Sequence, residues 1–143
     1  MIYTALTKKA MCLCFEAHKD QVDKSGTPYV FHPFHLAEQM QDEYTTVTAL
    51  LHDVVEDTDY TIEDLIDMDY PREVIEALQL LTHTNSVPYL DYVKAIKNNP
   101  IAKAVKLADL QHNSDTSRLD EITQDALNRV EKYKKAINLL SES

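Results

Sequence analysis

Residues 49–57 place four polar side chains on an otherwise apolar segment, and this run restricts the possible folds more than any other part of the chain. Its apolar residues predict a helix that is buried nearly all round. Residues four apart share one face of a helix, so Glu56 lies one turn beyond His52. The same spacing places Asp57 one turn beyond Asp53. Unpaired charge is costly in a protein core, so these groups need partners or a bound metal.

The two stacked pairs suit two different chemical tasks. The imidazole and carboxylate of His52 and Asp53 can hold a divalent cation. The carboxylates of Glu56 and Asp57 can position or deprotonate a water molecule. A His-Asp dipeptide also arises often by chance, so this interpretation needs matching residues elsewhere in the chain.

The remaining sequence predicts an all-α fold of about seven or eight helices in a single domain spanning residues 1–143. Apolar residues recur at three- and four-residue steps, and no window of four to eight residues has the pattern of a strand. The one glycine disfavours tight hairpins and glycine-rich phosphate loops. We expect helices at about residues 4–18, from 33, and at 45–57, 61–65, 71–81, 89–98, 101–110 and 123–140.

The net charge, the length of the apolar runs and the cysteines each argue against a class of protein. A net charge of −10 disfavours non-specific binding to nucleic acid or to an anionic membrane, because both need a basic surface. No apolar run approaches the ~18 residues of a membrane span. Cys12 and Cys14 point to different faces of the first helix and are interpreted as reduced packing residues. The N-terminus lacks the pattern of a secretory signal, so we expect a cytoplasmic protein.

Two more segments place candidate metal ligands on apolar helices. His32 lies at a helix entrance between apolar residues, where a lone histidine more often has a structural role. Asp109 lies among apolar helical residues and needs a partner, and Asn113 follows one turn later on the same side. Together, the side chains of His32, His52, Asp53 and Asp109 form a mixed set of nitrogen and oxygen ligands that suits Mn²⁺, Fe²⁺ or Zn²⁺. Such an ion activates water for the hydrolysis of a phosphate ester.

The loop at residues 24–28, Lys-Ser-Gly-Thr-Pro, breaks the helical pattern after the first helix. Its lysine, serine and backbone amides can meet an anion. The same residue types also form ordinary solvated turns, and these residues alone leave both interpretations open.

Six segments between residues 14 and 119 share the pattern of one family. They are Ala17-His18, Lys24-Ser25-Gly26-Thr27-Pro28-Tyr29, His32-Pro33, 50–58, 105–109 and Asn113. With these segments the chain resembles the HD-domain metal-dependent phosphohydrolases, and within them the small RelA/SpoT-type hydrolases that remove the 3′-diphosphate of (p)ppGpp. The resemblance implies an HD-domain helical bundle with an activity like that of a guanosine-3′,5′-bis(diphosphate) 3′-diphosphatase.

The resemblance also implies roles for individual residues. The metal ligands would be His32, His52, Asp53 and Asp109, and the usual ion of the family is Mn²⁺. The residues that position or activate the attacking water would be Glu56 and Asp57. The residues that line the substrate pocket would be Lys24, Ser25, Asn113, Thr116 and Leu119.

Two acidic residues near the implied pocket depart from the family's pattern. Asp23 stands where the family usually has an arginine packed against guanine, and Asp115 where it often has another basic residue. Stacking on a purine is worth on the order of 1–3 kcal/mol. We therefore expect (p)ppGpp to be a poorer substrate than for enzymes with the arginine, and Asp23→Arg to improve it chiefly through KM. Lys24, Lys106 and Arg118 still favour a small phosphorylated substrate, in particular a nucleotide.

Two functions from different classes fit these residues. One is a metal-dependent phosphohydrolase that acts on a small phosphorylated metabolite. The alternative is a non-catalytic acidic helical module that binds metal or a ligand without turnover. Glu56 and Asp57 favour the enzyme, because a second carboxylate pair adds negative charge that a scaffold does not need.

Overall fold

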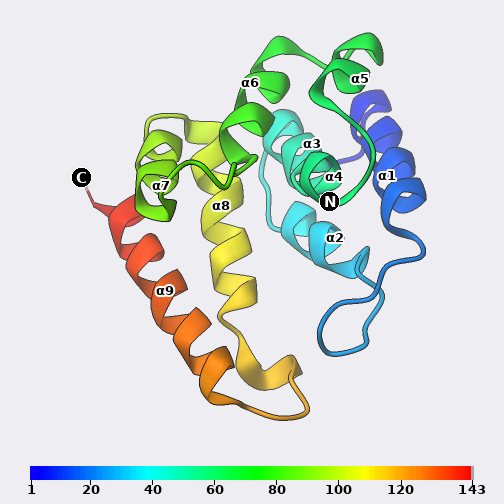
Figure 1. The fold of residues 1–143 in the computed structure, drawn as a ribbon. Helices are drawn as coiled ribbons and strands as arrows, with labels where there is room; N and C mark the ends of the chain where they lie inside the picture. The colour runs from blue at the N-terminus through cyan, green and yellow to red at the C-terminus, as the bar shows by residue number, and fades with distance from the viewer. Residues whose placement is uncertain (143) are drawn as a thin grey trace.

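The computed structural model describes residues 1–142, apart from the side chain of Arg118, and confirms the all-α prediction (Figure 1). Within that range the chain forms nine α-helices and one short 3₁₀ helix. They are α1 (Ala5–His18), α2 (Phe31–Glu38), α3 (Glu43–Leu51), α4 (Val54–Asp57), α5 (Ile62–Asp67), α6 (Arg72–Leu81), α7 (Tyr89–Lys97), α8 (Pro100–Asn113), η1 (Thr116–Arg118) and α9 (Gln124–Ser141). None of these helices is long and apolar enough to cross a membrane.

Short polar residues begin several of the helices, as their positions in the sequence indicate. Each of four such side chains accepts a hydrogen bond from the backbone N–H three residues later: Thr4, Thr61, Asn99 and Thr123. These bonds satisfy donors that have no partner inside a helix, which fixes where the helix starts.

Two helix starts differ from the expectation. The helix expected from Thr45 begins at Glu43, because the Asp42 side chain accepts a hydrogen bond from the Thr45 N–H and caps the helix earlier. The helix expected to open with Pro33 begins at Phe31, so the proline is its third residue. A proline is tolerated there because the first N–H groups of a helix have no intrahelical partner.

The single helix expected through residues 49–57 is divided in two. α3 ends at Leu51 and α4 begins at Val54, with His52 and Asp53 between them. The His52 Nδ1–H donates a 2.7 Å hydrogen bond to the carbonyl of Ala49, and Asp53 has φ −102° and ψ −1°, outside the ideal helical region. Adjacent residues of a regular helix do not face each other. The break therefore lets both side chains point to one place.

α3 forms the centre of the helical core. Every residue from Thr45 to Leu51 is buried, and α3 packs against α1, α2, α6 and α8. α8 lies between this group and α9, which packs on α7 and α8 at the opposite side of the molecule (Figure 1). As a result α2, α3 and α8, which carry or adjoin the predicted ligands, all contact one another in the interior.

The loop between α1 and α2 is ordered by backbone pairing. An isolated β-bridge joins Val22 to Pro28, and the Asp23 N–H donates a 2.8 Å hydrogen bond to the Thr27 carbonyl. Gly26 at the tip has a φ of +83°, a left-handed conformation that glycine adopts without strain. The loop therefore has a defined shape beside the first turn of α2.

Candidate functional site

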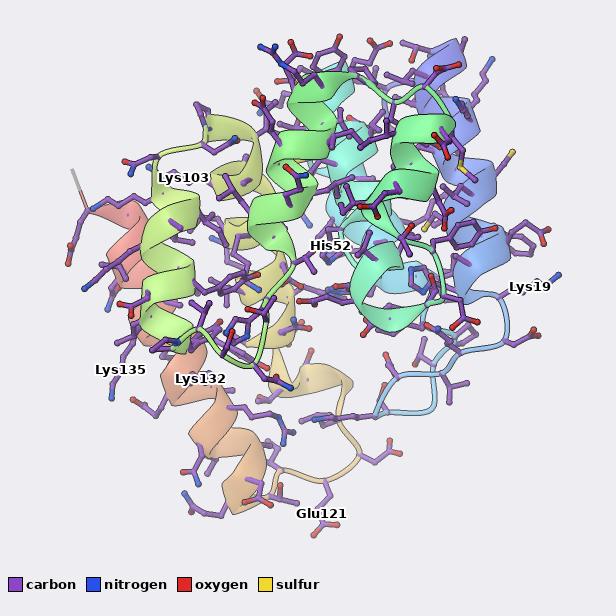
Figure 2. The ribbon with its side chains drawn as sticks, turned by 45° about the horizontal axis from the view of Figure 1, so that its top comes forward. Lys19, His52, Lys103, Glu121, Lys132 and Lys135 are labelled. Carbon is purple, nitrogen blue, oxygen red and sulfur yellow. The ribbon has the colours of Figure 1, made fainter. Side chains whose placement is uncertain are left out.

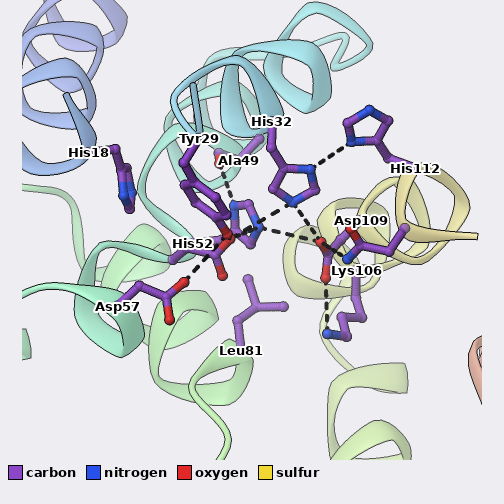
Figure 3. A network of polar contacts seen from close by, with 12 residues as sticks. His18, Tyr29, His32, Ala49, His52, Asp57, Leu81, Lys106, Asp109 and His112 are labelled. Carbon is purple, nitrogen blue, oxygen red and sulfur yellow. Dashed lines mark hydrogen bonds and ion pairs between the residues drawn. The ribbon is translucent and has the colours of Figure 1, made fainter. Parts of the chain in front are cut away.

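Three of the predicted metal ligands, His32, His52 and Asp109, meet in the interior between α2, α3 and α8 (Figure 3), and Asp53 lies beside the two histidines. One ligand atom from each of His32, His52 and Asp109 lies within 4.8 Å of the other two, and all three residues are buried. His32 Nε2 is 2.9 Å from Asp109 Oδ1, and His52 Nε2 is 3.6 Å from that oxygen. Asp53 Oδ2 is 3.0 Å from His52 Nε2 and 3.8 Å from His32 Nε2. We call these four residues the His/Asp centre.

His52 is oriented as a metal ligand requires. Because its Nδ1–H donates to the Ala49 carbonyl, the neutral ring carries its lone pair on Nε2. In the neutral ring this buried atom is an acceptor that no donor among the described residues reaches, because it faces the carboxylate oxygens of Asp53 at 3.0 Å and Asp109 at 3.6 Å. An orphaned imidazole nitrogen facing two carboxylates fits a divalent cation with mixed nitrogen and oxygen ligands.

Charged neighbours set the ionisation of the centre. Burial opposes a charge on Asp109, but the Lys106 ammonium, 3.0 Å from Oδ2, and the two imidazoles outweigh it and hold its pKa well below the usual value. Asn113 Nδ2 also donates a 3.0 Å hydrogen bond to Asp109 Oδ1. Burial likewise opposes a charge on His52, but Asp53 and Asp109 raise its pKa well above the usual value. A metal that binds here therefore takes the place of a proton.

Two side chains that the sequence analysis did not single out also hold the centre. Tyr29 donates a hydrogen bond to Asp53 Oδ2, and its hydroxyl is 3.4 Å from Asp57 Oδ2. His112 Nδ1 lies 2.7 Å from His32 Nδ1. Outer contacts of this kind fix the orientation of ligands. Their positions in the sequence could have identified both residues. Tyr29 directly follows the Lys-Ser-Gly-Thr-Pro loop, and His112 lies one helical turn beyond the predicted ligand Asp109.

Glu56 and Asp57 lie at the rim of the centre, which corrects the expectation of a helix buried nearly all round. Both residues are exposed on one side because α4 is only four residues long and ends at the surface. Glu56 Oε1 accepts a 2.5 Å hydrogen bond from the His83 N–H. Partial burial and the nearby Asp53 carboxylate raise the pKa of Glu56 and of Asp57. The two carboxylates can therefore take up a proton more readily than free ones.

A first hollow of about 300 Å³ opens beside the centre and brings together all five residues predicted to line a substrate pocket. They are Lys24, Ser25, Asn113, Thr116 and Leu119. Asp23 and Asp115 also line it, together with Arg129 and the apolar side chains of Val22 and Val130. The side chain of Arg118, predicted as a basic neighbour, lies outside the described part of the chain.

Asp23 has a structural role that its position alone did not indicate. Its Oδ1 accepts hydrogen bonds from the Ser25 N–H at 2.9 Å, the Ser25 hydroxyl at 2.6 Å and the Thr27 N–H at 3.0 Å. An aspartate that accepts from the backbone two residues on stabilises a turn. Asp23 therefore fixes the loop that carries Lys24 and Ser25 to the first hollow.

A second hollow of about 470 Å³ also opens at the centre, and its lining includes residues of α7 and α9. Its lining includes Glu56, Asp57 and Asp109, and also two lysines, Lys106 and Lys132. Both hollows share three lining residues: Tyr29, Asn113 and Tyr133. The His/Asp centre therefore lies where two openings meet.

Comparison with known proteins finds relatives that are named as enzymes of guanosine nucleotides. No family model matches the chain. The Mus musculus protein named guanosine-3′,5′-bis(diphosphate) 3′-pyrophosphohydrolase MESH1 is 33% identical over 114 residues, which are 69% of this chain and 63% of that protein. A probable GTP pyrophosphokinase of Mycobacterium leprae is 32% identical over 127 residues, which are 80% of this chain and 16% of that protein. The chain thus spans less than two thirds of the length of either relative.

A solved structure extends the similarity to the fold. It is described as a metazoan ortholog of SpoT that hydrolyzes ppGpp, and it matches with a TM-score of 0.76 and 26% identity. The match covers 99% of this chain and 88% of the other. The predicted resemblance is confirmed: in sequence and in fold, this chain is an HD-type relative of the RelA/SpoT-like hydrolases.

Proposed function

We propose that this protein is a metal-dependent phosphohydrolase that cleaves a phosphate or diphosphate ester of a small metabolite, with the 3′-diphosphate of (p)ppGpp as the first candidate. The observation that carries the proposal is that buried ligand atoms of His32, His52 and Asp109 lie within 4.8 Å of one another, with the acceptor Nε2 of neutral His52 facing carboxylates and no donor. A buried polar atom without a partner is costly, so it indicates a ligand.

Four residues would hold the cation: His32, His52, Asp53 and Asp109. We propose Mn²⁺ as the resident ion, with Fe²⁺ and Zn²⁺ as the alternatives that the mixed donor set also suits. When bound, the ion supplies positive charge that polarises a phosphoryl oxygen and acidifies a water molecule. Tyr29 and His112 keep the ligands in place through their contacts with Asp53 and His32.

Glu56 and Asp57 would position the attacking water and accept its proton. A general base works best when its pKa is near the working pH, and partial burial together with Asp53 moves both pKa values in that direction. Among the described residues, the carboxylates of Asp53 and Asp109 pair with the imidazoles of His32 and His52, and those of Glu56 and Asp57 do not. Their placement at the rim therefore supports a role on water rather than on the metal.

A nucleotide substrate is supported by the first hollow and by the names of the relatives. The hollow combines apolar walls with Lys24, Ser25 and Asn113, which suits a base and sugar next to an anionic group. MESH1 is named for hydrolysis of guanosine bis(diphosphate). The pyrophosphokinase name of the Mycobacterium leprae relative is not carried over, because the match covers only 16% of that protein.

The test is a screen of the manganese-loaded protein against nucleotide and sugar phosphates, with released phosphate and pyrophosphate measured separately. Metal content is measured on the same samples. We expect a nucleotide diphosphate ester to be cleaved by the wild-type protein and not by the matched variant Glu56→Gln. A protein that binds metal but cleaves nothing in the screen would favour the alternative, a non-catalytic metal- or ligand-binding module.

A further inference from the structure

The second hollow contains a row of cations and aromatic rings that leads away from the His/Asp centre. Lys106 Nζ is 3.0 Å from Asp109 Oδ2 and 5.3 Å from the centre of the Tyr92 ring. The Tyr92 and Tyr89 rings are 5.8 Å apart between their centres. Lys132 Nζ lies 4.1 Å from the centre of the Tyr89 ring. The row therefore extends from a predicted ligand on α8 to the exposed face of α9.

Lys132 differs from Lys106 in what holds it. The Lys106 ammonium is paired with Asp109, whereas no ion pair of Lys132 is found among the described residues. Lys132 instead lies against the face of Tyr89, an interaction that holds a cation without neutralising it. In a chain with a net charge of −10, an unneutralised ammonium that lines a hollow next to the centre favours an anionic ligand.

We infer that the second hollow is the subsite for the distal phosphate of a diphosphate ester, and that Lys132 is the residue that binds it. The inference rests on the proposed function. The first hollow has apolar walls and two aspartates at its edge, Asp23 and Asp115, which suit a nucleoside better than a second phosphate. The four carboxylates that line the second hollow belong to the centre and its rim, whereas Lys132 and the rings of Tyr89 and Tyr92 line its outer part. The reacting phosphorus then lies at the centre, between the two hollows.

The chemistry is balanced in this arrangement. The water oxygen bonds to the phosphorus next to the ester, and the bond from that phosphorus to the ester oxygen breaks. One proton of the water passes to the rim carboxylates, and the ester oxygen takes up a proton as it leaves. The two phosphates depart together as pyrophosphate, so Lys132 contacts the distal phosphate both before and after the reaction.

The test compares Lys132→Met with Lys135→Met by calorimetry. Figure 2 shows the two lysines on α9. Both residues are exposed on α9 and both variants lose one positive charge, but Lys135 lines neither hollow. Inorganic pyrophosphate, titrated as its manganese complex, and inorganic phosphate are the two probes. We expect Lys132→Met to weaken pyrophosphate binding about tenfold with phosphate binding changed less than twofold, and Lys135→Met to leave both unchanged.

Binding and turnover separate the two proposals. Three results would overturn the subsite even if the protein hydrolyses a nucleotide. Lys132→Met could bind pyrophosphate with wild-type affinity, it could lose affinity equally for pyrophosphate and phosphate, or both variants could lose the same affinity for pyrophosphate. A selective loss of pyrophosphate binding in a protein that cleaves no phosphate ester would support the subsite and overturn the proposed hydrolysis. In an active enzyme, Lys132→Met should raise KM for a diphosphate ester about tenfold and leave KM for the matching monophosphate ester unchanged.

Discussion

The carboxylates inside the His/Asp centre and those at its rim lie in opposite electrostatic environments. Asp109 is buried, yet Lys106 and two imidazoles hold its pKa well below the usual value. Glu56 and Asp57 are partly exposed, yet burial of their inner side and the charge of Asp53 raise their pKa values. Both groups consist of ordinary aspartate and glutamate side chains. The neighbouring residues therefore decide that the inner carboxylates stay ionised and that the rim carboxylates can accept a proton.

The largest effect is expected from His52→Ala, which removes a side chain from the inner group. This variant should lose both metal binding and turnover, because Nε2 of His52 is a buried ligand atom that faces the carboxylates of Asp53 and Asp109. A ligand that binds only the folded protein raises its melting temperature. We expect Mn²⁺ to raise the melting temperature of the wild type and of the control His35→Ala, which is exposed on α2, but not that of His52→Ala. An undiminished response in His52→Ala would remove it from the ligand set.

The next effect is expected from Glu56→Gln, which changes the rim and leaves the inner group intact. Turnover should fall by about 10²-fold, the usual cost of a missing acid–base group. Metal content, measured by elemental analysis, should be unchanged. The amide oxygen can still accept the hydrogen bond from the His83 N–H, so the loop at His83 should stay in place. Release of the metal from Glu56→Gln would contradict the separation into inner and rim groups.

A smaller effect is expected from the aspartate at the edge of the first hollow. Asp23→Asn keeps the Oδ1 acceptor that the turn requires and removes a charge that repels a polyphosphate. We expect KM for (p)ppGpp to fall a few-fold with little change in kcat. The structure qualifies the gain expected for Asp23→Arg, because that change also removes three hydrogen bonds of the loop. Equal steady-state constants for wild type and Asp23→Asn would mean that the charge at Asp23 does not limit binding.

The smallest effect concerns stability of the metal-free protein. A raised pKa means that folding favours the protonated form of Glu56, so its carboxyl group stabilises the fold at low pH and loses that contribution as pH rises through the folded pKa. Glu56→Gln should therefore raise the free energy of unfolding at pH 7 by on the order of 0.5 kcal/mol, after discounting for solvent screening. The gain should disappear near pH 4. Denaturant unfolding at both pH values measures it, and a gain that grows on acidification would reverse the sign.

The sequence predicted the helices well and singled out the four inner residues, which the structure brings close together, because both follow from local patterns. Apolar spacing identifies helices, and His32 and Asp109 were noticeable as polar groups on apolar segments. The break at His52 and Asp53 was missed because it depends on a side-chain bond to the Ala49 carbonyl, which helical periodicity does not encode. The helix was expected to continue for the same reason, and Glu56 was expected to be buried with it.

The second hollow shows where local patterns reach their limit. Lys132 lies among charged residues of α9 whose spacing predicts only a solvated face, and Tyr133 fits an ordinary packing position. Their place beside Tyr89 depends on how α9 packs against α7 and α8, which is a contact between distant parts of the chain. The five residues predicted to line a substrate pocket do line the first hollow. The resemblance to the family indicated them, and helical periodicity did not.

The bond between His32 and Asp109 joins residues 77 positions apart in the sequence. A metal bound to both would act as a reversible cross-link between the two halves of the chain, comparable to a disulfide that closes a long loop. Its stabilising effect would follow the free concentration of the ion rather than a redox state. In a cell starved of that ion, the protein would open more often and be degraded faster, so metal supply would set its abundance as well as its activity.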